Sequence, residues 1–189
     1  MTQAQWTSVM PNNPSCFKGD LNRPVENVSL ADCQDFLAKI QVTVANQFQG
    51  FKARFPTLKQ WKYACLAGSN GELGNDDRTG QTGKIDVMAW YNGNSNPSPL
   101  DEAGKNESNP VGRKHKNSFG FFDMHGNVCE LCMCDDVGGK LYRYCGGSFN
   151  STAEECSALR CRLAEKGDLN GRNEIGLRVA LVQDDEILK

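Results

Sequence analysis

The chain has 189 residues, of which 39% are hydrophobic, and its 21 Lys and Arg residues nearly balance its 23 Asp and Glu residues. This composition is typical of one folded domain and excludes a disordered chain. The balanced charge argues against a nucleic-acid partner, which would favour a basic surface. No segment approaches the roughly 20 apolar residues of a membrane-spanning helix, so we expect no membrane insertion.

The first residues contain neither a basic region nor an apolar stretch, so we expect no signal peptide. The protein would then be cytoplasmic, or displayed on a virion or cell surface by other means. Nine cysteines are an odd number that cannot all pair within one chain. Cys33 and Cys65 fall on apolar faces of predicted helices, which favours mostly reduced thiols and a reducing setting. One disulfide among the C-terminal cysteines stays open as the exception.

The first part of the chain predicts helices. A short helix is expected at residues 3–10. A longer one is expected at residues 29–47, where Ser29 caps the N-terminus and Asp32 suits a capping box. The apolar face of this helix recurs at helical spacing and consists of Leu30, Cys33, Phe36, Leu37 and Ile40. A third helix is predicted at residues 57–67.

Thr57 caps this third helix, and Gly68 ends it. Residues 68–118, which follow, are dense in Gly, Asn, Asp, Ser and Pro. Because a structureless loop of this length is unusual in a compact domain, we expect bound cations and a backbone-rich hydrogen-bond network to hold it.

Short strands are predicted after residue 118, at residues 141–145, 158–163 and 176–182. In the last of these, apolar and other residues alternate, as in a strand with one buried face. Helices thus come first, a long loop region follows, and strands come last. This order predicts an α+β fold rather than an alternating parallel sheet.

Seven short segments, in order, resemble one protein family. They are Gln5-Trp6 through Gly19, Pro24-Val25-Glu26-Asn27-Val28-Ser29, Phe55-Pro56-Thr57 through Gly68, Asn109-Pro110-Val111-Gly112, Phe119-Gly120 through Glu130, Gly146-Gly147-Ser148-Phe149, and Gly176-Leu177-Arg178-Val179-Ala180. The family is the sulfatase-modifying, formylglycine-generating-enzyme domain, and the resemblance covers nearly the whole chain.

The resemblance implies a C-type-lectin-like α+β fold with two main helices, short antiparallel strands and much irregular loop structure. We therefore expect residues 1–189 to form a single domain. Family members usually have an early strand before the segment that matches Gln5-Trp6, and this chain is expected to lack the usual N-terminal strands.

The resemblance also implies a calcium site. In the family, the side chains matching Asp123 and Glu130 and the backbone carbonyls matching Gly126 and Val128 hold the ion. Carboxylates together with carbonyls are the oxygen ligands that calcium requires. The alternative is a plain turn with solvated acids. A second calcium site around Asn92 and Asn94 is a weaker expectation.

The oxidases of this family bind copper(I) through two cysteines, a ligand type that suits this soft ion. Cys156 matches the second position, but the first is Ser151. A serine hydroxyl is a poor copper(I) ligand, so no copper and no catalytic residue are expected, and Cys156 is interpreted as a vestigial core thiol. The alternative is a copper-dependent oxidase with an altered site.

The iron-dependent branch of the fold takes histidines from an extra helical domain. This chain has only His115 and His125, both expected at the surface.

Cys129, Cys132 and Cys134, with Cys145 beyond, have the spacing of a zinc knuckle. The first two fall at family positions that usually hold Trp and Cys, so the preferred interpretation is a core strand or turn. Zinc stays open as the alternative.

The segment between Phe149 and Ile175 resembles the diversified part of the variable proteins of diversity-generating retroelements. Such proteins display exchangeable side chains on this fold's ligand face, so we expect a non-catalytic module that binds a protein or a glycan. The expected contact residues are Asn150, Ser151, Thr152, Leu159, Arg160, Arg162, Leu163, Leu169, Asn170 and Arg172. The alternative is that the segment forms only core strands and loops.

Overall fold

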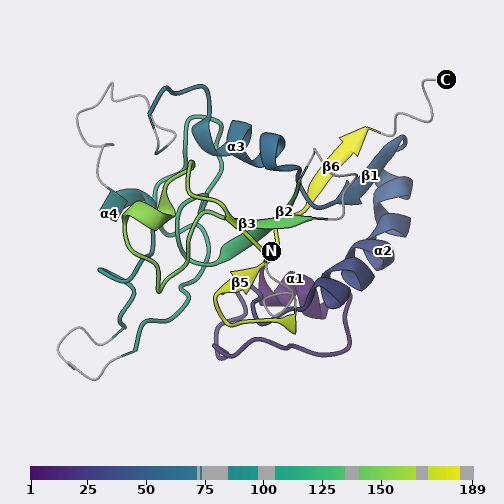
Figure 1. Ribbon diagram of the computed structural model, residues 1–189. Coiled ribbons are helices and arrows are strands. Elements are labelled where there is room, and N and C mark those ends of the chain that lie inside the picture. The colour runs from purple at the N-terminus through teal and green to yellow at the C-terminus, as the bar shows by residue number, and fades with distance from the viewer. Residues whose placement is uncertain (72, 74–84, 98–104, 135–140, 165–169, 184–189) are drawn as a thin grey trace.

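The computed structural model describes residues 1–71, 73, 85–97, 105–134, 141–164 and 170–183 (Figure 1). The helices are α1 Gln3–Thr7, α2 Leu30–Gln47, α3 Leu58–Leu66 and α4 Ile85–Met88, with a 3-10 turn, η2, at Glu154–Cys156. The strands are β1 Phe51–Arg54, β2 Cys129–Met133, β3 Tyr142–Cys145, β4 Arg162–Leu163, β5 Ile175–Gly176 and β6 Ala180–Gln183. The expected α+β class is confirmed.

Side-chain caps fix the starts of the two main helices. The Ser29 hydroxyl accepts a hydrogen bond from the Asp32 amide at 3.1 Å, and the Asp32 carboxylate accepts one from the Ser29 amide at 3.0 Å. Thr57 and Gln60 form the same reciprocal pair at the start of α3. These bonds satisfy amides that no helical carbonyl can reach.

The predicted helix at residues 3–10 is shorter than expected and ends at Thr7.

Four strands form the central sheet in the order β4-β3-β2-β5. β2 pairs antiparallel with β3, placing Glu130 opposite Cys145, and parallel with β5. β1 and β6 form a separate antiparallel ribbon, which lies beside α2 in Figure 1. The predicted strand at residues 176–182 is therefore two strands in two sheets. The chain leaves the first sheet after Gly176, because Leu177 is buried in the core and Arg178 bonds to Glu130.

The predicted strand at residues 158–163 is also wrong in extent. Only Arg162–Leu163 pairs, and residues 157–160 form a turn in which the Arg160 amide bonds to the Ser157 carbonyl. β1 was not predicted as a strand, whereas the segment of β2 was predicted only as a core strand or turn. Hydrophobic alternation is hard to recognise in both, because β1 is exposed or half-buried and β2 is buried on both faces.

Two hydrophobic clusters lie on opposite faces of β2. Leu131 belongs to the larger, in which the rings of Trp6 and Phe36 stack at 4.9 Å. Cys132 belongs to the smaller, together with Trp61 of α3. The central sheet is thus packed on both sides, which gives the loops around it a rigid base.

The loop region predicted to be held by a backbone network contains such a network in its described part. The Asn109 amide donates to Asn127 Oδ1 at 2.9 Å, and Asn127 Nδ2 returns a bond to the Asn109 carbonyl at 2.9 Å. The Asn127 amide also bonds to the Trp90 carbonyl at 2.7 Å. Within the described ranges, no helix is both long and apolar enough to cross a membrane.

Candidate functional site

The loop before β2 holds the residues predicted to bind calcium. Asp123, Gly126 and Asn127 all have positive φ, at 54°, 70° and 63°. A Cβ on Gly126 would lie only 2.0 Å from the Trp90 carbonyl oxygen. Glycine at this position is therefore required by both backbone conformation and space. The loop follows a tightly constrained path that brings Asp123 and Glu130 to one hollow of about 330 Å³.

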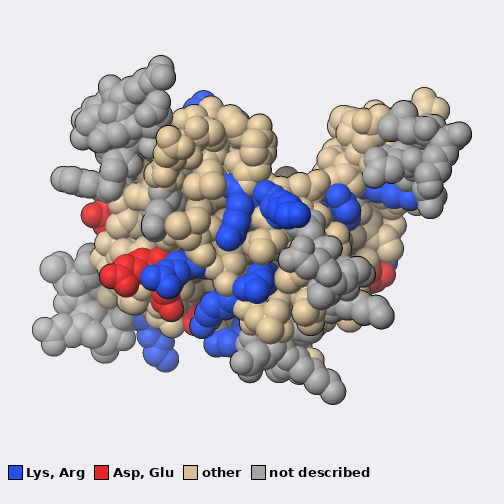
Figure 2. Space-filling view, turned by 45° about the horizontal axis from the view of Figure 1, so that its top comes forward, with Lys and Arg blue, Asp and Glu red and all other residues tan. Residues whose placement is uncertain are grey.

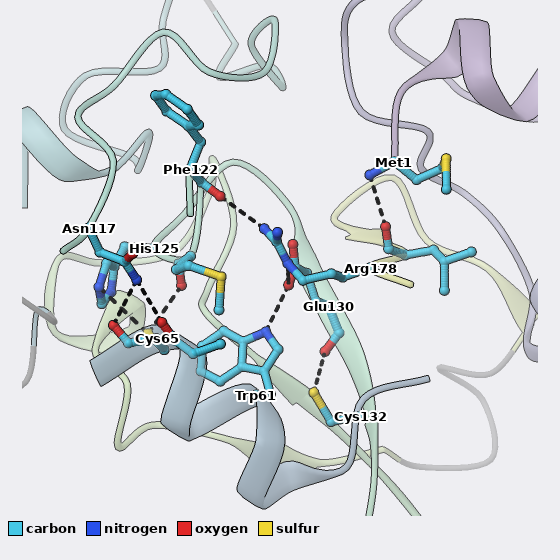
Figure 3. Close-up of polar contacts among 12 residues, drawn as sticks. Met1, Trp61, Cys65, Asn117, Phe122, His125, Glu130, Cys132 and Arg178 are labelled. Atoms are coloured by element: carbon cyan, nitrogen blue, oxygen red, sulfur yellow. Dashed lines mark hydrogen bonds and ion pairs between the residues drawn. The ribbon is translucent and has the colours of Figure 1, made fainter. Parts of the chain in front are cut away.

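Glu130 lies at the centre of a buried polar network (Figure 3). Its Oε2 accepts hydrogen bonds from Trp61 Nε1 and Arg178 Nε, both at 2.7 Å. Arg178 also donates to the Phe122 carbonyl at 2.9 Å. Because Glu130 is nearly buried, its charge is balanced mainly by Arg178. The network ties α3, β2 and the segment between β5 and β6 together.

Asp123 is held differently. Its Oδ2 accepts a bond from the Gly112 amide at 2.7 Å, but its Oδ1 is buried and has no hydrogen-bond partner among the described residues. Burial raises the pKa of Asp123, and the hydrogen bond from the Gly112 amide and the charge of Arg178 oppose that rise only in part. A buried carboxylate oxygen without a partner is costly and suits a cation.

The donors predicted to bind calcium fit the ion in part. Asp123 offers a buried oxygen with no hydrogen-bond partner in the described ranges, and Val128 lines the same hollow. Glu130 already uses one oxygen for Trp61 and Arg178, so an ion would take the other. Across the described part of the chain, no three His, Cys, Asp or Glu side chains gather around one metal-sized point. Calcium binding stays a proposal.

A second calcium site was predicted near Asn92 and Asn94, but the side chain of Asn94 has a structural role. Asn94 Oδ1 accepts from the Tyr91 amide at 3.0 Å, and its Nδ2 donates to the Ala89 carbonyl at 3.0 Å. Both ends of the amide therefore hold the turn after α4. The Asn92 amide bonds to the Ser151 carbonyl at 3.0 Å, which anchors that turn to the C-terminal segment.

Ser151 and Cys156 match the two cysteine positions of the family's oxidases. The Ser151 hydroxyl accepts from the Ser148 amide at 3.1 Å and lies 3.3 Å from the Ser148 hydroxyl, so it closes a turn. The Cys156 thiol is fully buried, and burial raises its pKa to about 12. A thiol that stays protonated at neutral pH is a poor metal ligand and nucleophile.

The expectation that both histidines lie at the surface is wrong for His125, although His115 is exposed. His125 is only 1% exposed, and its Nδ1 lies 2.7 Å from the Cys156 carbonyl oxygen. Its Nε2 contacts the Leu73 carbonyl at 3.0 Å and the Cys65 sulfur at 3.6 Å. Burial lowers the pKa of His125, which favours the neutral ring. His125 lies in the loop between α4 and β2, and its contacts tie that loop to the segments of Leu73 and Cys156, so it is a structural link.

The four cysteines of the zinc alternative do not converge. Cys129 and Cys132 are three residues apart in β2 and belong to the two clusters on opposite faces of that strand. Cys145 forms a disulfide with Cys161. The other seven cysteines, including Cys134, are free. The arrangement is the core strand of the preferred interpretation, with the one disulfide that the sequence left open.

Most of the predicted contact residues are exposed. Of the ten, Leu169 lies outside the described residues and Ser151 is half-buried, whereas the others have exposed side chains. Ser151, Leu159, Arg160 and Arg162 line one hollow of about 470 Å³. Asn150 lines a second hollow, where its side chain donates to Glu174 at 3.0 Å. The turn at residues 150–151 therefore separates two hollows.

The register of the sheet divides this set further. Arg162 pairs with Tyr144 across β3 and β4, and Leu163 pairs with Arg143. Neighbouring residues of a strand point to opposite faces. Leu163 therefore lies on the opposite side of the sheet from Arg162, and one surface cannot use both. Sequence reasoning missed Glu154 and Glu155, which line the hollow that Arg160 and Arg162 share.

Residues 1–182 match the model of the sulfatase-modifying factor enzyme 1-like domain, so the chain belongs to that family. A curated relative, the chaperone protein LppX of Paenibacillus barcinonensis, is 31% identical over 170 residues, covering 70% of this chain. The chain spans 59% of the length of that relative.

Three solved structures share the fold. Treponema denticola variable protein 1 has a TM-score of 0.76 at 21% identity, covering 96% of this chain and 81% of its own. CarF has a TM-score of 0.67 at 20% identity, covering 96% and 83%. PvdO from Pseudomonas aeruginosa has a TM-score of 0.65 at 21% identity, covering 88% and 64%. The expected formylglycine-generating-enzyme-like fold is confirmed.

Proposed function

We propose that this chain is a non-catalytic binding module that presents its C-terminal segment, residues 150–172, to a protein or glycan partner. The observation that carries the proposal is the state of Ser151 and Cys156, which stand at the two cysteine positions of the family's oxidases. Ser151 closes a turn through Ser148, and Cys156 is a buried thiol with a raised pKa. Neither group offers the thiolate that copper(I) chemistry requires.

The arrangement of exposed and buried residues in the segment supports a binding role. Thr152, Leu159, Arg160 and Arg162 are exposed, whereas Cys156, Ser157 and Ala158 between them are buried. Exposed side chains on a packed base can be exchanged with little effect on folding. This is the arrangement that a display surface needs.

The names of two similar proteins support this proposal. A chain of similar fold is named a variable protein, and a relative in sequence is named a chaperone. We extend these names to this chain only as part of the proposal, in which the partner is a protein or glycan and the segment is diversified by a retroelement. A near-repeat of the codons for this segment beside a reverse transcriptase gene would test the diversification directly.

An activity assay tests the non-catalytic part. The protein, with and without copper, is incubated with a cysteine-containing sulfatase peptide, and formylglycine is measured by mass spectrometry. We expect no turnover above that of a Cys156→Ser control. Copper-dependent turnover well above this control would instead establish an oxidase with an altered site.

We propose further that one calcium ion strengthens the scaffold at Asp123 and Glu130, with the backbone carbonyls of Gly126 and Val128. The support is the buried Asp123 Oδ1, which lacks a hydrogen-bond partner among the described residues. When bound, the ion would neutralise a buried negative charge, and it would have no part in chemistry.

A further inference from the structure

The hollow beside η2 has two walls from two short segments. The first wall consists of Ser151, Glu154 and Glu155, and the second consists of residues 159–162. Its lining also includes the nearly buried Cys129 and Tyr144 of the central sheet. The volume of about 470 Å³ is large enough for a few side chains of a partner. The proposed display surface therefore contains a depression whose lining comes from two segments and from the central sheet.

The two walls carry opposite charges. Glu154 and Glu155 line the first wall, and Arg160 and Arg162 line the second. Figure 2 shows a face of the molecule on which basic side chains gather in the middle with a smaller acidic group beside them. Within the described part of the chain, no ion pair joins any of these four residues to another charge. The charges of the two walls therefore line the same hollow without pairing directly with each other.

Local contacts keep the charges in place. The Glu155 carboxylate accepts a bond from the Thr152 amide at 2.9 Å, which fixes it against the first wall. On the other side, Arg162 pairs with Tyr144 in the sheet, so its side chain is on the face that the hollow occupies. Its charge acts on the Cys129 thiol there. The separation of the walls is thus set by η2 and β4, two elements of the fold.

We propose that this hollow binds a protein segment that carries an acidic and a basic side chain close together. The acid would pair with Arg160 and Arg162, and the base would pair with Glu154 and Glu155. The side chain of Leu159, 54% exposed, offers an apolar contact beside them. The inference rests on the proposed binding function and names the class of partner.

Charge complementarity favours a mixed-charge protein segment over other ligands. A polyanion would meet Glu154 and Glu155, and a polycation would meet Arg160 and Arg162, so one wall would repel either. A neutral glycan would cover both walls and leave their charges without partners, which is unfavourable on desolvation.

Panning a random dodecapeptide display library against the purified chain tests the proposal. Three further proteins are panned in parallel: Arg160→Ser/Arg162→Ser, Glu154→Gln, and an Arg113→Ser control whose exposed residue lies outside the lining of the hollow. We expect the unmodified chain and the control to enrich peptides with an acid and a base within a few residues. The arginine variant should lose the acid preference, and the glutamate variant the base preference.

Individual enriched peptides should lose at least about tenfold in affinity for each hollow variant and should bind more weakly at high salt. Unchanged melting temperatures would show that every variant is folded. Enriched peptides that lack either charge, or that bind all variants equally, would overturn the proposal but leave a binding module in place. The absence of any enrichment would also overturn it.

A glycan array, read with the same proteins, separates the remaining outcomes. Binding of sulfated glycans that depends on Arg160 and Arg162 but not on Glu154 would replace the mixed-charge partner with an anionic glycan on the same surface. Glycan binding that is equal in all of these proteins would place the contacts outside this hollow, and would overturn the mixed-charge proposal but not the proposed binding function.

Discussion

Two neighbouring regions of this chain are built in opposite ways. The scaffold region, residues 123–130 with Gly146 and Gly147, is buried except for the half-buried Asp123, contains several residues with positive φ, and is held by the bond between Glu130 and Arg178. The display region, residues 150–163, leaves most of its charged side chains without described partners and is anchored from beneath by buried residues. The difference indicates where substitution should unfold the protein and where it should alter only binding.

The largest effect is expected at the centre of the scaffold region. Glu130→Gln should lower the free energy of unfolding by about 3 kcal/mol, because it leaves the Arg178 charge without its nearly buried partner. Denaturant unfolding measures this, with Glu154→Gln as the matched control from the display region, expected within about 0.5 kcal/mol. Equal effects of the two changes would remove the distinction between the regions.

The disulfide joins Cys145, which is next to Gly146 of the scaffold region, to Cys161 of the display region, and it should stabilise the protein by a similar amount. Cys145 at the end of β3 and Cys161 before β4 are 16 residues apart, and closing a loop of this size stabilises by about 3 kcal/mol. Cys161→Ser should therefore lower the free energy of unfolding by about that amount, whereas Cys16→Ser, at an exposed free thiol, should change it little. If the two variants unfold alike, the disulfide does not anchor the display region.

Calcium should affect only the scaffold region. At 100 times its dissociation constant, one ion would add about 2.7 kcal/mol to stability, so chelation should lower the melting temperature. Asp123→Asn should remove this dependence while leaving the disulfide effect unchanged. A melting curve of metal-free protein that does not respond to added calcium would contradict the site.

The pH dependence of the chelated protein tests the same residue. Because burial raises the pKa of Asp123, its contribution to stability is present below its unfolded pKa of about 4 and is lost as the pH rises through the raised value. Asp123→Asn should therefore flatten the stability of the chelated protein across this range. An identical pH profile in the variant would mean that Asp123 has the same pKa in the folded and unfolded protein, which would contradict this prediction.

Features set by neighbouring residues could be predicted from the sequence better than contacts between distant segments, for physical reasons. Caps such as Ser29 with Asp32 are local, so they could be recognised without the fold. His125 was misplaced because its partners, Leu73 and Cys156, come from distant segments. The predicted strand through Gly176 could not reveal that Leu177 and Arg178 turn into the core between two sheets.

In the display region, composition predicted exposure but not geometry. Arg162 and Leu163 are neighbours in the sequence, and only the pairing of β4 with β3 shows that they face opposite sides. Glu154 and Glu155 were passed over because the hollow they share with Arg160 exists only once η2 forms. The opposite charges of these glutamates and of Arg160 are visible in the sequence, but the sequence does not show that they line one hollow.

The central claim is that the display region binds a partner but is not needed for folding. One multiple variant tests it most directly, because it should change stability little and should abolish binding. Its replacements are Thr152→Ala, Leu159→Ser, Arg160→Ser, Arg162→Ser and Arg172→Ser, and its melting temperature and its binding to a selected ligand are measured together. We predict a melting temperature within a few degrees of the unmodified chain and loss of binding. Unfolding of the variant would show that the segment is core, and retained binding in a folded variant would place the ligand face elsewhere.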